Sequence, residues 1–347
     1  MCKLAIVILN WNGADMLRRY LPSVIKNSQV EGVKVVVADN GSTDDSIDVL
    51  RTCFPSVDLI LLDQNYGFAG GYNNALKQIE AEYYLLLNSD VEIRQKNWIV
   101  PMLDYMDLHP ETCACQPKLM KLFADNTSCD NLFEYAGAAG GYLDKYGYPF
   151  CRGRIFNTIE QDKGQYDDVV PIHWATGAAL LVRSKSYWEV DGLDEKFFAH
   201  MEEIDLCWRM RLNGGKIVCI TESTAYHLGG ATLNQGNPRK TYLNFRNNLI
   251  MLYKNLPENR LRKVMPIRHI LDLIASAKFL LSGDFGNMKA VIKATFAYRK
   301  MKKVYSKQKK GVQLNGDNLS SNYLKPYSIL WHYYVKGNKV YSSLPED

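Results

Sequence analysis

The sequence predicts an α/β protein in which helices flank a mainly parallel sheet, followed by a basic helical extension. Apolar segments of strand length alternate with helical segments through the first half of the chain. One of these segments, YYLLLN at 83–88, is apolar without alternation, which is typical of a strand covered on both faces. Residues 261–310 hold 13 Lys or Arg and two Asp, a net charge of +11 in a chain whose total is +5.

The predicted elements follow in order from the start of the chain. We expect strands at 4–10, 34–39, 57–62 and 83–88, with helices at 16–28, 42–53 and 70–81 between them. Such alternation implies βαβ crossovers, so the strands should run parallel. Because parallel strands end at the same edge of a sheet, where open α/β folds bind ligands, Asn10, Asp39 and the Asn88-Ser89-Asp90 segment should lie together.

Composition and simple motifs exclude several classes of protein. The 347 residues can form one large core, or one domain with an appendage. The first apolar run is too short for a signal peptide, and no run reaches the roughly 18 residues of a membrane-spanning helix. Eight cysteines without a CxxC pair suggest a reducing cytosol, with neither disulfides nor structural zinc. No G-x-G-x-x-G or G-x-x-x-x-G-K-[ST] motif supports a dinucleotide-binding dehydrogenase or a P-loop NTPase.

Two polar stretches also have simpler interpretations. DNGSTDDS at 39–46 contains Asn-Gly, a common turn, and Ser42 or Thr43 could cap the next helix. NYGFAGGYNNA at 65–75 is rich in Gly and Asn and could be a flexible loop. Taken alone, each stretch leaves the choice between turn and ligand site open.

Seven stretches in order decide the matter: VILNWN, VVVADNGSTDDS, NYGFAGGYNNAL, YYLLLNSD, WATGAALLVRS, FFAHMEEIDLCWRMRLNGG and YHLGGATL. Their order, over residues 3–250, resembles family 2 glycosyltransferases of the GT-A fold, in particular the rhamnosyltransferase-like bacterial branch. The resemblance implies an inverting enzyme that moves a hexosyl or deoxyhexosyl group from a nucleoside-diphosphate sugar to an acceptor hydroxyl. It places the catalytic domain at 1–255 and a helical, basic region at 256–347.

The resemblance also implies a divalent cation, Mn²⁺ or Mg²⁺, which neutralises the leaving diphosphate. The family's D-x-D motif is Asn88-Ser89-Asp90 here, so Asn replaces the first Asp. Asp90 and His227 are the expected metal ligands. The residues assigned by resemblance to the donor nucleotide sugar are Leu9, Asn10, Asp39, Asn65, Gly67, Asn73, Asn88, Ser89 and Arg246.

The predicted base lies in HMEEIDLCWRMRL. An inverting displacement needs a carboxylate that deprotonates the acceptor hydroxyl. The family usually has Glu-Asp where this chain has Glu202-Glu203, so Glu203 is the expected base and Glu202 its substitute. Acids in a first helical turn also favour the helix dipole without any catalytic role. The acceptor side is assigned by resemblance to Trp174, Thr176 and Gly177.

Two other functions are compatible with an architecture of this kind and are compared with the sequence. A sugar-nucleotide pyrophosphorylase shares the architecture but needs a Gly- and Arg-rich loop after the first strand, which NWNGADMLRR does not provide. A catalytically impaired nucleotide-sugar-binding or scaffolding relative is the main alternative, because Asn88 and Glu203 depart from the family pattern.

The C-terminal region has an apolar helical stripe at 267, 270, 271, 274, 277 and 281, followed by the basic stretch RKMKKVYSKQKK. It is either a packed helix with a solvated tail or a surface that contacts an anionic membrane. Family acceptors are often lipid-linked glycans of cell-surface polysaccharide biosynthesis, which favours the membrane. Nucleic-acid binding is disfavoured because no recognisable module accompanies the charge. The expected location is therefore the cytoplasm, with peripheral contact at the inner face of the cytoplasmic membrane.

Overall fold

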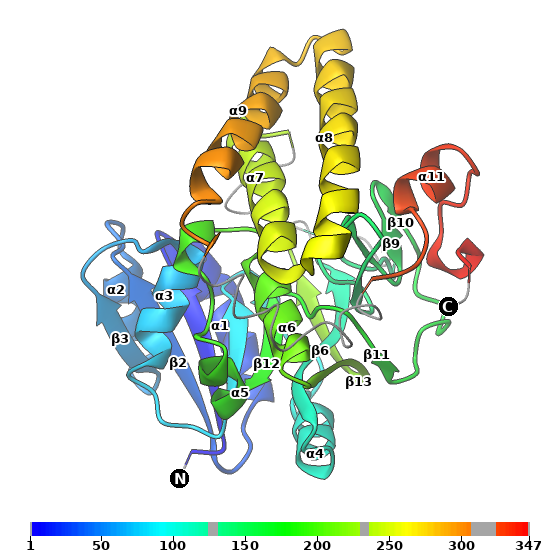
Figure 1. The fold of residues 1–347 in the computed structure, drawn as a ribbon. Coiled ribbons are helices and arrows are strands. Elements are labelled where there is room, and N and C mark those ends of the chain that lie inside the picture. The colour runs from blue at the N-terminus through cyan, green and yellow to red at the C-terminus, as the bar shows by residue number, and fades with distance from the viewer. Residues whose placement is uncertain (1, 124–130, 230–235, 307–323, 346–347) are drawn as a thin grey trace.

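The computed structural model describes residues 2–123, 131–229, 236–306 and 324–345 (Figure 1). Its centre is a mixed sheet in which four neighbouring strands run parallel and β12 runs antiparallel to both of its neighbours. Its strands, in spatial order, are β11 (Val170–Pro171), β13 (Lys216–His227), β6 (Thr112–Lys121), β12 (Ala179–Arg183), β4 (Tyr83–Asn88), β1 (Leu4–Asn10), β2 (Val33–Asn40) and β3 (Asp58–Leu62), and β5 (Val91–Glu92) pairs with β13. The four predicted strands are confirmed as β1 to β4.

Helices cover both faces of this sheet, as the apolar strands predicted. Along β1, Leu4, Ile6 and Ile8 face one buried cluster, while Ala5 and Val7 face the other. The flanking helices are α1 (Ala14–Asn27), α2 (Ser46–Cys53), α3 (Gly67–Leu76), α4 (Val100–Leu108), α5 (Ser184–Glu189) and α6 (Glu202–Leu212). The N-cap of α2 is Asp45, so the interpretation that Ser42 or Thr43 caps this helix is wrong.

A second, smaller sheet was not predicted from the sequence. Its strands are β7 (Gly141–Leu143), β8 (Pro149–Cys151), β9 (Arg154–Ile155) and β10 (Thr158–Ile159), paired in the order β10-β9-β8-β7. With two or three residues each, these strands are too short to show a period in the sequence.

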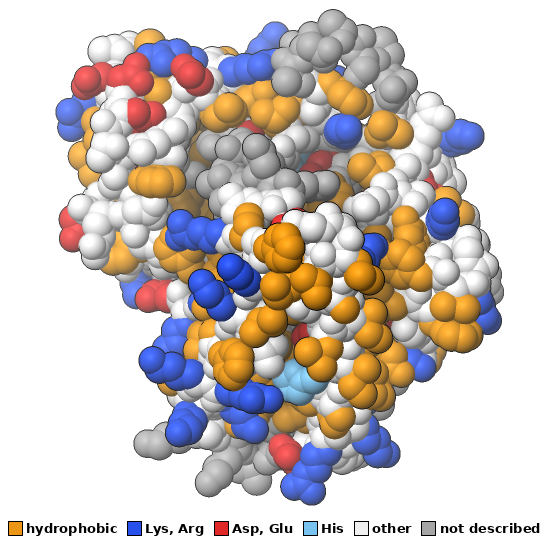
Figure 2. Space-filling view, turned by 90° about the horizontal axis from the view of Figure 1, so that it is seen from above, with side chains coloured by type: hydrophobic (Ala, Val, Ile, Leu, Met, Phe, Trp, Pro, Cys, Tyr) orange, Lys and Arg blue, Asp and Glu red, His pale blue; other side chains and the backbone are white. Residues whose placement is uncertain are grey.

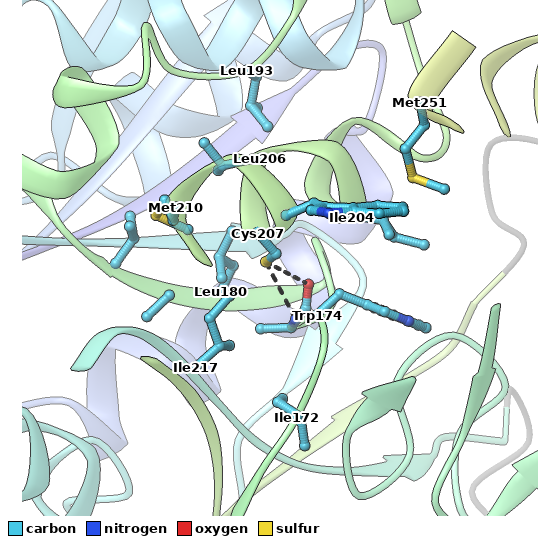
Figure 3. Close-up of a cluster of buried hydrophobic side chains, with 14 of the residues drawn as sticks. Ile172, Trp174, Leu180, Leu193, Ile204, Leu206, Cys207, Met210, Ile217 and Met251 are labelled. Carbon is cyan, nitrogen blue, oxygen red and sulfur yellow. Dashed lines mark hydrogen bonds between the residues drawn. The ribbon is translucent and has the colours of Figure 1, made fainter. Parts of the chain in front are cut away.

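The start of α6 is held by a buried cluster drawn in Figure 3. Side chains of α6 pack against β12 and β13, and Met251 lies on the opposite side of the helix. The backbone N–H of Ala175 also donates to Cys207 Sγ at 3.4 Å. The members labelled in the figure are Ile172, Trp174, Leu180, Leu193, Ile204, Leu206, Cys207, Met210, Ile217 and Met251. This packing fixes the two acids, Glu202 and Glu203, at the first turn of the helix.

The C-terminal part is helical, as predicted. In Figure 1, α8 and α9 form an antiparallel hairpin beside α7. The hairpin rises from residues 1–255, the predicted catalytic domain, which is called the catalytic part below. The chain then returns to the small sheet, where the Tyr341 ring lies 5.4 Å from that of Tyr142. The elements are η1 (Glu195–Phe197), α7 (Pro238–Asn255), α8 (Glu258–Leu281), α9 (Phe285–Met301), α11 (Ile329–Tyr334) and η3 (Tyr341–Ser343). Among the described residues, no helix is both long and apolar enough to cross a membrane.

Candidate active site

The ends of β1, β2 and β4 meet at one edge of the sheet, as expected. Asn10 pairs in register with Asp39, and its Nδ2 donates to Asp39 Oδ2 at 3.0 Å. Asp39 Oδ1 accepts from the backbone N–H of Ser42 at 2.9 Å, so DNGSTDDS is a turn that also fixes a buried carboxylate. Asn10 Oδ1 is buried and accepts no hydrogen bond from the described residues. A Cβ at Gly13 would lie 2.5 Å from this oxygen, so only glycine leaves room for the Asn10 side chain in this position.

The glycine-rich stretch at 65–75 lies beside the same edge of the sheet. Asn65 Oδ1 accepts from the backbone N–H of Gly67 at 2.8 Å and from Asn40 Nδ2 at 3.2 Å. Gly67 has φ +72°, and a Cβ there would lie 2.7 Å from the ring of Phe198. Only glycine therefore allows the start of α3 to approach the loop before α6 this closely.

Asp90 and His227 are adjacent. His227 Nε2 lies 3.1 Å from Asp90 Oδ1 and 3.2 Å from Asn88 Nδ2, while His227 Nδ1 lies 3.2 Å from Glu134 Oε1. Burial alone would lower the pKa of His227, but the carboxylates of Asp90 and Glu134 raise it to about 10. At this site the imidazole lies between the two carboxylates. Among the described residues, no three His, Cys, Asp or Glu side chains are grouped so that they could hold a metal ion.

Glu202 and Glu203 begin α6 with one carboxylate oxygen each that lacks a partner. Oε2 of both residues is buried and forms no hydrogen bond within the described part of the chain. Burial raises the pKa of Glu203 to about 7, and burial together with the Glu203 charge raises the pKa of Glu202 well above its ordinary value. A Cβ at Gly177 would be 3.7 Å from Glu203 Cβ, so the predicted acceptor loop lies against the predicted base.

The backbone before these acids is strained. Phe198, His200 and Met201 have φ values of +67°, +70° and +72°, a region that disfavours side chains larger than glycine. Asn247 Nδ2 lies 2.7–3.0 Å from the carbonyl oxygens of Phe197, Ala199 and His200, and so holds this loop against α7.

The rest of α6 is anchored by ion pairs. Asp205 contacts Arg209 Nε and Lys254 Nζ, both at 2.8 Å, as the i, i+4 spacing of Asp205 and Arg209 predicted for that pair.

Known proteins similar to this chain are glycosyltransferases. Residues 5–129 match the family model described as "Glycosyl transferase family 2". Over these residues the chain is similar to family 2 glycosyltransferases. It is 24% identical to an N-acetylglucosaminyl-diphospho-decaprenol L-rhamnosyltransferase of Mycobacterium tuberculosis, over 65% of the chain and 75% of that protein. It is 26% identical to the rhamnosyltransferase WbbL of Escherichia coli K12, over 64% of the chain and 82% of WbbL.

Solved structures confirm the GT-A fold. GalNAc-T7, solved with UDP, GalNAc and Mn²⁺, gives a TM-score of 0.55 at 14% identity, over 73% of the chain and 48% of that protein. Residues 1–349 of S. aureus TarS, solved with UDP-GlcNAc, give 0.53 at 17% identity, over 98% of the chain and 93% of that structure.

Four predicted site residues of this glycosyltransferase have polar groups that bind the protein itself. Asn73 Oδ1 accepts from Tyr187 Oη at 2.6 Å, and its Nδ2 donates to the carbonyl of Leu193 at 2.8 Å. Arg246 Nη2 donates to the carbonyl of Phe197 at 2.9 Å. Trp174 Nε1 donates to the carbonyl of Tyr142 at 3.0 Å, and Thr176 Oγ1 accepts from the backbone N–H of Ala178 at 3.2 Å. Asn73 and Arg246 hold the loop before α6, whereas Trp174 and Thr176 support Gly177.

Two residues near the site were missed. Glu134 belongs to FEYAGAAGG, which carries no recognisable motif, and it reaches His227 only through the fold. Asn247 lies in RKTYLNFRNNL, where the resemblance indicated amides near the site, but the sequence does not reveal which amide binds the strained loop.

Proposed function

We propose that this glycosyltransferase moves a sugar from a nucleoside-diphosphate sugar to an acceptor hydroxyl, with inversion and with the help of a divalent cation. Glu203 acts as the base, Asp90 and His227 hold the cation, and the polar edge formed by Asn10, Asp39 and Asn65 receives the nucleotide.

The unpartnered carboxylate oxygens of Glu202 and Glu203 are the observation that carries this proposal. A buried carboxylate without a hydrogen-bond donor is destabilising. A substrate hydroxyl seated beside Gly177 would supply the missing donor. The raised pKa of Glu203 also suits a base that works near neutral pH, because such a carboxylate accepts a proton readily and is still ionised in about half of the molecules. Residues that serve stability alone, such as Asp205 in the same helix, have their charge neutralised instead.

The donor set fits Mn²⁺ or Mg²⁺ at the other end of the site. Asp90 Oδ1 and His227 Nε2 lie 3.1 Å apart, and these two residues would hold the cation once His227 has lost its proton. Glu134, at the opposite ring nitrogen, would orient the imidazole, as carboxylates commonly do for metal-bound histidines. Once bound, the cation neutralises charge on the leaving diphosphate. Only two protein ligands are proposed, which is usual for a cation that also binds substrate phosphates.

The identities of the relatives suggest the substrates. Two of them are named rhamnosyltransferases, and one is named for an acceptor in which N-acetylglucosamine is linked through a diphosphate to decaprenol. We therefore propose a hexose or deoxyhexose donor and a glycan acceptor, carried on a lipid diphosphate, within cell-surface polysaccharide biosynthesis.

A donor screen tests the proposal. The protein is incubated with Mn²⁺ and a panel of nucleotide sugars, and release of the nucleoside diphosphate is measured without acceptor and with lipid-linked N-acetylglucosamine. We expect slow hydrolysis of one donor and faster turnover when the acceptor is present. The anomeric configuration of the product, read by NMR, must be opposite to that of the donor.

A catalytically impaired sugar-binding relative is the second candidate. It is favoured by Asn88 in place of the usual Asp and by Glu203 in place of the usual shorter acid. Both substitutions keep an oxygen atom in position, so activity remains the preferred proposal. Donor binding measured by calorimetry, together with no hydrolysis and no transfer under any condition of the screen, would establish the second candidate.

A further inference from the structure

From Ile267 onward, helix α8 has its apolar side outward, whereas its first turns bury Leu261, Val264 and Met265. Its buried residues include Arg268, Asp272 and Ser276, whereas Ile270, Leu273, Ile274 and Leu281 are 58%, 66%, 59% and 89% exposed. A helix that packs only on its own domain normally shows the opposite arrangement. The stripe recognised in the sequence is therefore real, but it points away from the catalytic part.

Polar contacts explain how α8 is held in this orientation. Arg268 Nη2 lies 3.5 Å from Asp272 Oδ1, and Arg268 Nη1 donates to the carbonyl of Tyr146 at 3.0 Å. The Arg268 guanidinium also lies 3.8 Å from the centre of the Tyr148 ring. The inner side of α8 thus binds the turn between β7 and β8. These Arg268 contacts fix the rotation of the helix and therefore the outward direction of its aliphatic side chains.

The apolar surface extends over the neighbouring helices. On α9, Phe285, Ile292 and Phe296 are exposed, and on α11 the exposed side chains include Trp331 and Tyr334. Lys278 Nζ of α8 lies 5.4 Å from the centre of the Tyr334 ring, which places α11 beside α8. Figure 2, the view from above, shows hydrophobic side chains gathered on this face with Lys and Arg side chains around them. Amphipathic aromatic rings are typical of the boundary between a bilayer and water.

A basic cavity of about 660 Å³ opens where α8 begins and α9 ends. Its lining includes Arg262, His269, Arg299, Lys302 and Lys303. Arg262 pairs with Glu258, at 3.1 Å. Arg299, Lys302 and Lys303 form no ion pair with another described residue, so three positive charges border a space large enough for a phosphate group. Pro266 lines the cavity and is also exposed on the outer side of α8, which joins the cavity to the apolar face.

We propose that the outer face of α8, α9 and α11 docks on an anionic lipid bilayer, with lipid phosphates in the basic cavity. Apolar side chains enter the boundary between headgroups and acyl chains, while lysines and arginines contact the headgroups. A second copy of the chain fits this face less well, because pairing would bring together two segments that each carry a net charge of +11. Of the seven basic residues predicted from the sequence to act here, Arg299, Lys300, Lys302 and Lys303 lie within the described residues, and Lys307, Lys309 and Lys310 lie outside them.

Vesicle sedimentation tests the proposal. The full chain is mixed at low salt with vesicles of phosphatidylglycerol and phosphatidylcholine, or with vesicles of phosphatidylcholine alone. We expect binding to the anionic vesicles that weakens as salt is raised, and at least a tenfold weaker partition onto neutral vesicles. Equal binding to both compositions, or binding to neither at low salt, would overturn the proposal.

Matched variants locate the docking face. The triple variant R299Q/K302Q/K303Q should lower partition by about 100-fold, because each basic residue near the surface contributes about 1 kcal/mol. Its control, K26Q/K77Q/K96Q, removes the same charge from exposed positions on the catalytic part. If the control lowers partition as much as the triple variant does, the cavity has no special role and the proposal is wrong.

The apolar contribution has its own pair of variants. I270S/I274S should lower partition by roughly 10-fold or more, the effect of leaving two partly buried aliphatic side chains in water. The control L61S/L108S alters side chains that are 49% and 77% exposed on the catalytic part, and it should bind like wild type. If I270S/I274S instead abolishes a dimer and leaves partition unchanged, the face binds a second copy and the proposal fails. Docking does not depend on the donor site, so nucleotide-sugar binding by the same preparations separates a failure of docking from a failure of the proposed transfer.

Discussion

Glu203 is a partly buried acid with one carboxylate oxygen that is fully buried. Its Oε2 has no hydrogen-bond donor among the described residues, and burial raises its pKa to about 7. Glu203→Gln keeps the shape but cannot accept a proton, so we expect transfer to fall by roughly two to four orders of magnitude while donor binding is retained. Turnover and calorimetry measure the two effects. If Glu202→Gln causes the loss and Glu203→Gln does not, the two roles are exchanged.

The pKa of Glu203 also predicts two opposite pH effects. The base acts when ionised, so kcat should rise with pH through about 7. Stability should change in the other direction. Since the folded pKa lies above the ordinary value, the stabilising contribution is complete below about pH 4.5 and is lost as pH rises through 7.

The free energy of unfolding of Glu203→Gln should therefore exceed that of wild type by on the order of 1–3 kcal/mol at pH 8, and by little at pH 4. Denaturant titrations at the two pH values provide the measurement. A variant less stable than wild type at pH 8 would show that the carboxylate has a partner in solution.

Asp90 is the second single residue on which the proposed chemistry depends, because it is one of the two proposed cation ligands. Asp90→Asn keeps the volume of a buried side chain but removes the negative charge that binds the cation and pairs with His227. We expect transfer to be abolished, Mn²⁺ binding by calorimetry to weaken at least tenfold, and circular dichroism to be unchanged. Full turnover by this variant, or by wild type in excess chelator, would remove the cation from the mechanism.

Among the elements, prediction from sequence succeeded where a residue pattern is compatible with only one type of secondary structure. The apolar runs that became β1 to β4 are long enough to show their type, and their shared direction brings Asn10, Asp39 and Asp90 to one edge. The small sheet could not be predicted because its strands, with two or three residues each, are too short to show a pattern. Trp174 sits in a motif, yet its ring packs under Gly141, a contact that depends on a strand 33 residues away. The carboxylate of Glu134 beside His227 is likewise set by tertiary structure alone.

The loop between η1 and α6 depends on α7 for its shape. Asn247→Ala removes the donor that contacts three carbonyl groups and leaves the positive φ values of the loop unsupported. We expect stability to fall by about 1–3 kcal/mol, the cost of leaving buried carbonyls unpaired, and kcat to fall roughly 10-fold or more because Glu203 follows this loop.

Ser28→Ala is the matched control for Asn247→Ala. It removes a buried acceptor from Trp98 Nε1, at 2.9 Å, in a cluster on the other face of the sheet. A similar loss of stability with unchanged kcat in this control would separate positioning from general destabilisation. An unchanged kcat in Asn247→Ala would show that the loop does not need the clamp.

In the whole molecule, the helical hairpin is positively charged and the rest of the chain is negatively charged. Outside residues 261–310, the chain sums to −6, against +11 within them. In Figure 1, α7 to α9 stand over the side of the sheet toward which β1, β2 and β4 run. Arg246 and Asn247 of α7 contact the loop before α6, and α7 packs against α8 and α9, so the helix next to the docking face borders the proposed site. If the face docks on a bilayer as proposed, this arrangement would bring the site close to acceptors that are anchored in the membrane.

The last prediction follows from this arrangement and concerns salt. Attraction between exposed charges extends about 10 Å at 0.1 M salt and about 3 Å at 1 M, so high salt should release the enzyme from an anionic surface. Between 50 and 500 mM NaCl, transfer to a lipid-linked acceptor in phosphatidylglycerol vesicles should fall roughly 10-fold or more, because few basic residues then contribute to binding. Transfer to a short-chain, water-soluble acceptor should change by less than about twofold, since the buried pairs of the site are screened far less. Initial rates with both acceptors, taken from one enzyme preparation, make the comparison. If both rates fall together, salt acts on the donor site, and proximity to the membrane contributes nothing to turnover.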